Sequence, residues 1–286
     1  MILIPMLLLS LVASGCSQRD TAQVGNNDGK MQVFVSFATL AEFTASLGGD
    51  LVTVHSLVPS GADAHHWEPS PRDMADLTKA EIFIYNGLNM EPWLDKIKSS
   101  VDGPSYIFAG KGMTVTGNED PHIWLDPILA EAMVRNIARA LAEADKANAA
   151  AYRQNEESLI ARLQQLDGDY QRITRELGQR YLVVSHGAFA HLAARYNLTQ
   201  VSVLGTNADE MPNPAKMADL VDFCRSKGVT TIYYARGESS RVAETLAEEI
   251  GKNMMALDPI EHDIEGEDYF SRMRFNLEQL EQGMSR

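Results

Sequence analysis

Apolar side chains recur every three or four residues along a stretch of about thirty residues, from Ala147 to Leu177. This spacing keeps an apolar stripe on one side of an α-helix. The stretch has no Pro, and its only Gly is Gly168. At 1.5 Å per residue such a helix is about 45 Å long, more than one small domain needs. The pattern predicts a long helix that is either an ordinary surface helix or a backbone joining two lobes.

The segments before and after this helix resemble each other. Glu68–Leu77 and Met211–Leu220 each carry two Pro residues and the run Met-Ala-Asp-Leu at the same offset. Each segment then leads into a β-like run, Ile82–Tyr85 in the first half and Thr231–Ala235 in the second. The match favours an internal duplication, with the long helix between two related halves.

Short β-branched or aromatic runs alternate with helical patterns on both sides of the long helix. The predicted strands are Gln32–Phe37, Leu51–Val58, Ile82–Tyr85, Tyr106–Ala109, Tyr181–Ser185, Val201–Leu204, Thr230–Ala235 and Asn253–Leu257. The predicted helices between them are Thr39–Leu47, Ser70–Thr78, Pro127–Glu143, Ala188–Tyr196, Pro214–Ser226 and Arg241–Ile250. This alternation predicts an α/β fold with parallel sheets. We expect two lobes of βα repeats, residues 31–146 and 179–286, joined by one helix over residues 147–178.

The first fifteen residues are apolar and uncharged, and they end in Ala13-Ser14-Gly15-Cys16. They are too few for a stable membrane span but suit a signal peptide over residues 1–15. Small residues directly before a Cys resemble a bacterial lipobox, which makes Cys16 the expected lipidation site. Residues 16–30 then read as a solvated, lipidated tether. The alternative is a plain secretory signal that is cut elsewhere.

A formal net charge of −14 argues against nucleic acid as a partner, because phosphate binding needs a basic face, and it is compatible with attraction of cations. The apolar content of 45% is enough for packed cores. Cys224 is the only other cysteine. If Cys16 is acylated, no disulfide partner remains, so we expect Cys224 to be a buried thiol.

The residues that could carry chemistry stand at predicted strand ends or in nearby loops, where open α/β sheets bind their ligands. They are His65, His66, His122, His186 and Asp258. Each histidine alone is more often a hydrogen-bonded structural residue. Three imidazoles and a carboxylate together make a four-ligand set for a borderline divalent cation. Asp126, which is followed by Pro127, fits a helix cap better than a ligand.

Several motifs along the mature chain, from about Met31 onward, resemble one family, the cluster A-I or TroA-like solute-binding proteins of zinc and manganese ABC importers. The motifs are Gly61-Ala62-Asp63-Ala64-His65, Glu68-Pro69-Ser70-Pro71, Asn86-Gly87 with Glu91 and Trp93, Asp120-Pro121-His122-Ile123-Trp124-Leu125-Asp126-Pro127, Ser185-His186-Gly187-Ala188-Phe189 and Leu257-Asp258-Pro259. The resemblance implies two α/β lobes joined by a rigid backbone helix, with the metal in the cleft between them. It implies His65, His122, His186 and Asp258 as the metal ligands, and it favours His65 over His66.

The resemblance also implies a function. We expect an extracytoplasmic, lipid-anchored and monomeric receptor that captures a divalent metal and hands it to a membrane permease. An imidazole at position 186, in place of a harder carboxylate, favours Zn²⁺, with Mn²⁺ as the alternative. A zinc hydrolase is a rival, but such enzymes leave one metal position to water, and the sequence has no His-Glu-x-x-His helix. A surface adhesin with bound metal is the third alternative.

Overall fold

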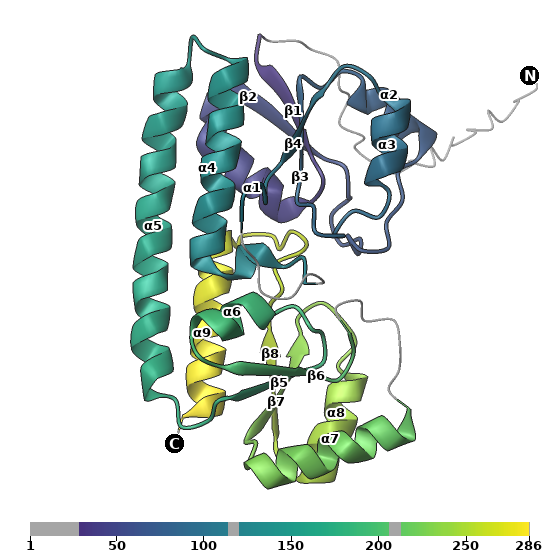
Figure 1. The fold of residues 1–286 in the computed structure, drawn as a ribbon, viewed down its shortest axis with the longest axis vertical. Coiled ribbons are helices and arrows are strands. Elements are labelled where there is room, and N and C mark those ends of the chain that lie inside the picture. The colour runs from purple at the N-terminus through teal and green to yellow at the C-terminus, as the bar shows by residue number, and fades with distance from the viewer. Residues whose placement is uncertain (1–28, 114–119, 206–212, 286) are drawn as a thin grey trace, which may run out of the picture.

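A computed structural model of the chain describes residues 29–113, 120–205 and 213–285. They form two lobes stacked along a long helix, and each lobe contains a four-stranded parallel sheet (Figure 1). The predicted signal peptide, Cys16, nearly all of the predicted tether and the first two residues of the Met211–Leu220 segment lie outside the described residues.

The two sheets have the same strand order, β2-β1-β3-β4 in the N-terminal lobe and β6-β5-β7-β8 in the C-terminal lobe. Equivalent pairs, such as β1 with β3 and β5 with β7, are parallel in both sheets. The strands are β1 (Met31–Val35), β2 (Val52–Ser56), β3 (Ile82–Tyr85), β4 (Ser105–Phe108), β5 (Tyr181–Val184), β6 (Thr199–Ser202), β7 (Thr231–Ala235) and β8 (Asn253–Leu257). The matching order is the structural counterpart of the sequence duplication.

Helices cover the sheets, and α2, α4, α7 and α9 begin at side-chain caps. Ser70 and Asp73 form a capping box at α2, and the Asp126 side chain accepts a hydrogen bond from the backbone of Ile128 at the start of α4. The N-terminal lobe carries α1 (Ala38–Gly48), α2 (Pro71–Leu77), α3 (Leu94–Ser100) and α4 (Pro127–Ala144), with short 3₁₀ turns η1 (Gly49–Leu51) and η2 (Ile123–Leu125). The C-terminal lobe carries α6 (Ala190–Arg195), α7 (Pro214–Lys227), α8 (Arg241–Ile250) and α9 (Tyr269–Met284).

The predicted long helix is α5 (Ala149–Glu176), and it runs along both lobes (Figure 1). Near its start, Asn155 Nδ2 donates a hydrogen bond to the carbonyl of Leu47 in α1, at 2.8 Å. Near its end, Tyr170 Oη donates to the carbonyl of Met273 in α9, at 2.7 Å. Its buried stripe packs into one apolar core that extends from the N-terminal lobe into the C-terminal lobe. The two-lobe α/β fold with a linking helix is therefore confirmed, and the surface-helix alternative is wrong.

Two helices, α3 and α9, lie where the sequence analysis predicts no element. The signal for α9 is present in the sequence, because Asp268 is a good N-cap and Phe270, Met273, Leu277 and Leu280 recur at helical spacing. Helix α9 is part of the C-terminal core, because it packs against both α5 and β8. Among the described residues, no helix is both long and apolar enough to span a bilayer.

Candidate metal centre

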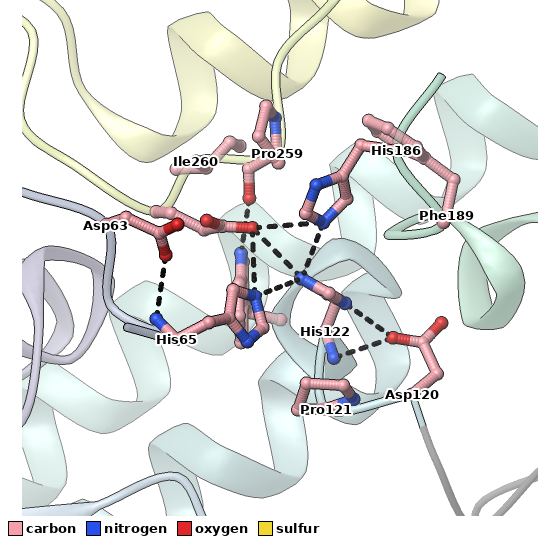
Figure 2. A network of polar contacts seen from close by, with 12 residues as sticks. Asp63, His65, Asp120, Pro121, His122, His186, Phe189, Pro259 and Ile260 are labelled. Carbon is pink, nitrogen blue, oxygen red and sulfur yellow. Dashed lines mark hydrogen bonds and ion pairs between the residues drawn. The ribbon is translucent and has the colours of Figure 1, made fainter. Parts of the chain in front are cut away.

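Four loops bring buried side chains together between the lobes. His65 lies in the loop after β2, His122 after β4, His186 directly after β5 and Glu261 after β8. All four loops leave the carboxyl ends of parallel strands, the edge at which open α/β sheets bind ligands. Figure 2 shows the three imidazoles pointing toward one another. The Glu261 carboxylate contacts all three of them.

The four donor atoms lie as far apart as the ligands of one tetrahedral ion. His122 Nε2 is 3.2 Å from both His65 Nε2 and His186 Nε2. Glu261 Oε1 is 2.9, 3.7 and 3.6 Å from the Nε2 atoms of His122, His65 and His186. Zinc with bonds of about 2.0–2.1 Å in a tetrahedron would separate its ligands by about 3.3 Å. The side chains are therefore already arranged around a point that a small cation would fit.

The centre is shielded from solvent. His122, His186 and Glu261 are 0%, 2% and 4% exposed, and His65, the most accessible of the four, is 7% exposed. His65 also lines a cavity of about 350 Å³ together with His66, Trp67, Glu68 and Trp93. A cavity therefore borders the centre on the side of His65.

Asp258, the expected fourth ligand, is not part of this group. Its carboxylate accepts hydrogen bonds from Arg272 Nε and Nη2 at 2.8 and 2.5 Å. A third hydrogen bond, at 2.8 Å, comes from the backbone N–H of Ile260. Arg236 Nη1 lies 3.4 Å from Asp258 Oδ2. The charge of Asp258 is neutralised by arginine, so the carboxylate that faces the imidazoles is Glu261, three residues later.

The path of the loop after β8 explains why Glu261, and not Asp258, faces the imidazoles. Ile260 has φ = 57°, a left-handed conformation that is unusual for a β-branched residue. Its carbonyl accepts a hydrogen bond from Thr39 Oγ1, and the carbonyl of Pro259 accepts one from Trp124 Nε1 at 2.8 Å. These contacts turn the chain so that Glu261 enters the centre. The only sequence signal for Glu261 was its place close to Asp258, since the backbone turn at Ile260 is not visible in residue types.

His122 is the central group of the cluster and is held from behind. Asp120 Oδ1 accepts hydrogen bonds from His122 Nδ1 at 2.6 Å and from the His122 backbone N–H at 2.9 Å. Burial alone would lower the pKa of His122, but the hydrogen bonds with Asp120 and Glu261 outweigh it and raise the pKa to about 9. Burial likewise raises the pKa of Glu261, yet its hydrogen bonds with His122 and His65 hold that pKa well below the ordinary value. A carboxylate behind the imidazole is the usual way to orient a metal-binding histidine.

The other two imidazoles have their own supports. Glu238 Oε1 lies 2.9 Å from His186 Nδ1, close enough for electrostatic contact although the two groups are not aligned as a hydrogen bond. Gln200 of β6 fixes the loop after His186, because its side chain bonds the backbone of Gly187 and Phe189. The His65 backbone N–H donates to Asp63 Oδ1 at 2.8 Å.

The remaining sequence candidates lie outside the cluster. His66 is largely exposed and pairs with Asp63 at 2.6 Å, and Glu68 is exposed. Asp126 caps α4, as predicted, and also forms an ion pair with Arg195. His191, a residue of α6 five positions after His186, is 2% exposed, and its Nε2 lies 2.8 Å from the carbonyl oxygen of Asp120. Cys224 is a buried free thiol, as expected.

Comparison with known proteins identifies the family of this chain. Residues 33–283 match the family described as "ZnuA: Zinc-uptake complex component A periplasmic". This chain belongs to that family. It is 31% identical over 300 residues to the high-affinity zinc uptake system protein ZnuA of Bacillus subtilis, covering 96% of this chain and 94% of the relative. The family resemblance expected from the motifs is thus confirmed, and the family is a transport family rather than a class of enzymes.

Solved structures of the ZnuA family have the same architecture. The Zn(II)-bound ZnuA-like domain of Streptococcus pneumoniae AdcA superposes with a TM-score of 0.81 at 31% identity, covering 90% of this chain and all of that domain. A laminin-binding protein of Streptococcus agalactiae, described as bifunctional with adhesin and metal-transporting activity, gives a TM-score of 0.83 at 28% identity, covering 88% of this chain and 99% of that one.

Proposed function

We propose that this protein is the extracytoplasmic solute-binding component of an ABC importer, and that it captures Zn²⁺ at His65, His122, His186 and Glu261 and delivers it to the membrane permease. The observation that carries the proposal is the convergence of three Nε2 atoms and one carboxylate oxygen, all within 4.8 Å of one another and all buried. Family membership and the zinc-bound relatives support the same function.

The donor set favours zinc over manganese. Mn²⁺ prefers carboxylate, carbonyl and water oxygens in octahedral geometry, whereas imidazole nitrogens in a four-coordinate arrangement suit Zn²⁺. Four protein donors also leave no open position for a reacting water, which argues against a zinc hydrolase. The cargo is therefore held and released, not used as a catalyst.

We further propose that Cys16 carries the lipid that anchors the mature chain to the membrane. The support is the run of small residues before Cys16 and the polar segment that follows it. A relative in Streptococcus pneumoniae is named zinc-binding lipoprotein AdcA, and the chain spans 60% of its length. A Cys16→Ser variant expressed in bacterial cells should leave the detergent phase in a phase-partition assay, and its retention there would overturn the anchor.

A metal titration tests the binding function. The mature protein is stripped of metal and titrated with Zn²⁺ and Mn²⁺ in parallel, following heat and thermal stability, because a ligand bound by the native state raises its stability. We expect one tight zinc site that is lost in His186→Ala and kept in His55→Ala, a half-buried histidine outside the centre. Zinc binding that survives His186→Ala, or its absence from the wild type, would refute the proposal.

A further inference from the structure

Asp120, which orients His122, is itself held by a helix from the opposite lobe. Its Oδ2 atom accepts the backbone N–H of Ala190 at 3.2 Å, and its carbonyl oxygen lies 2.8 Å from His191 Nε2. Both groups belong to α6, which begins four residues after His186. Figure 2 shows Asp120 on the side of His122 that faces away from the other ligands. Helix α6 therefore follows His186, a ligand of its own lobe, and holds Asp120, which orients His122 of the other lobe.

The contact between His191 and Asp120 requires the hydrogen to be on one particular nitrogen of the His191 ring. Its side chain is 2% exposed, so water does not compete for its nitrogen. A carbonyl oxygen can only accept a hydrogen bond, so Nε2 of His191 must carry the hydrogen. Asp120 is 6% exposed and uses both its carboxylate oxygens and its carbonyl in these contacts.

A second tie lies at the other end of α6. Arg195 Nε donates to both carboxylate oxygens of Asp126, at 3.0 and 2.9 Å, and its Nη2 is 2.9 Å from one of them. Asp120 and Asp126 bracket the segment that contains His122 and η2. The six residues of α6 therefore grip this segment of the N-terminal lobe at both ends. We call these contacts, Asp120 with Ala190 and His191 and Asp126 with Arg195, the α6 clamp.

We propose that His191 is a positioning residue for the metal centre, and that the α6 clamp couples the separation of the lobes to the orientation of His122. The proposal rests on the proposed zinc-binding function. His122 is the ligand that lies within 3.2 Å of each of the other three donors, so its orientation affects the whole set. A shift of α6 by about 1 Å stretches the His191 contact beyond hydrogen-bonding distance. Asp120 then loses support, His122 is free to turn, and the cargo loses its central ligand.

The effect of the clamp should appear in metal release. Removing a partner that orients a metal-binding imidazole typically weakens metal binding by about 10- to 100-fold. His191 acts one contact further away, so we expect about a tenfold loss in His191→Ala. The loss should appear as a faster zinc off-rate, measured by transfer to excess chelator, because the ligands themselves are intact.

The experiment uses the full mature chain with three variants, His191→Ala, His191→Gln and Leu192→Ala. The amide of Gln can donate a hydrogen bond from about the position of Nε2, so His191→Gln should recover most of the zinc affinity. Leu192 is buried on the same helix and makes no described contact with Asp120, so Leu192→Ala should lower stability but keep the zinc off-rate within twofold. Co²⁺ bound in place of zinc gives a visible absorption that reports ligand geometry, and only His191→Ala should change it.

The outcomes separate the two proposals. Wild-type protein that binds no zinc would overturn the proposed function itself. Wild-type binding with an unchanged off-rate and Co²⁺ spectrum in His191→Ala would overturn only the clamp. Equal losses in His191→Ala and Leu192→Ala would also overturn it, because they would show a general loosening of α6.

Discussion

The loops after β4 and β8 contain the same dipeptide and supply one donor each to the centre. Asp120-Pro121 precedes His122, and Asp258-Pro259 precedes Ile260 and Glu261. β4 and β8 occupy the same edge position in their sheets. In both loops the Asp side chain accepts the backbone N–H two residues later, at 2.9 Å for His122 and 2.8 Å for Ile260. The two Asp residues therefore perform the same task, which is to shape the turn.

The loops differ in what balances the charge of each Asp. Asp120 faces the imidazole of His122 and the backbone of α6. Asp258 faces the guanidinium of Arg272, which is only 3% exposed. Asp120 therefore interacts with a metal-binding imidazole, and Asp258 stabilises the fold through its ion pair with Arg272. In this pair, the aspartate that contacts an imidazole supports the metal centre, and the aspartate that is neutralised by arginine does not.

The largest expected effect is on the free energy of unfolding of Asp258→Ala. This change leaves the buried charge of Arg272 without its partner, a loss that typically costs about 3–5 kcal/mol. Urea unfolding of the metal-free protein measures it. Asp263→Ala, an exposed change in the same loop, is the control and should stay within about 0.5 kcal/mol of the wild type. An Asp258→Ala protein of normal stability that no longer binds zinc would mean that Asp258 is a ligand after all.

A smaller effect, on zinc affinity, is expected for Glu261→Gln. The amide keeps the size of the side chain but removes the negative charge 2.9 Å from His122 Nε2. We expect zinc binding to weaken about 100-fold, which equals about 2.7 kcal/mol. Competition with a chelator of known affinity measures the loss, and Glu265→Gln, an exposed residue of the same loop, should show none. Unchanged affinity in Glu261→Gln would remove Glu261 from the donor set.

Much of the fold could be predicted because it rests on local patterns. The strands predicted at Ile82–Tyr85 and Asn253–Leu257 match β3 and β8 residue for residue. The apolar stripe predicted α5 to within two residues at each end. The short helix α3 has only one buried residue, Ile97, and so leaves almost no periodic signal.

The centre was less predictable because it depends on contacts between distant segments. The three histidines could be proposed from their positions at strand ends. The choice between Asp258 and Glu261 depends on Arg272, fourteen residues further on, and on the turn at Ile260. The burial of His191 depends on how α6 meets the other lobe. No local pattern contains this information.

The supports of the two Asp-Pro loops also differ in whether they can titrate. The carbonyl of Pro121 accepts a hydrogen bond from Asn86 Nδ2 at 2.9 Å, and Asn86 in turn donates its backbone N–H to Glu91 Oε1 at 2.7 Å. Glu91 also accepts from Ser36 Oγ at 2.6 Å and from the Gly87 backbone at 2.9 Å. Burial raises the pKa of Glu91 to about 7, and these hydrogen bonds offset burial only in part. Arg272, the corresponding support of the C-terminal loop, stays charged at every accessible pH.

The smallest expected effect is therefore a pH dependence specific to the N-terminal loop. Because the pKa of Glu91 in the folded protein is raised above 4.5, its contribution to stability is fully present below pH 4.5 and is lost as the pH rises through about 7. Between pH 5 and pH 7.5, the unfolding free energy of metal-free wild type should fall by about 2 kcal/mol relative to Glu91→Gln. Urea unfolding of both proteins at the two pH values measures the difference between their unfolding free energies. Groups that titrate equally in both proteins cancel in this difference. A difference that is the same at both pH values would show that Glu91 is ionised throughout, and that both loops rest on charges that do not titrate in this range.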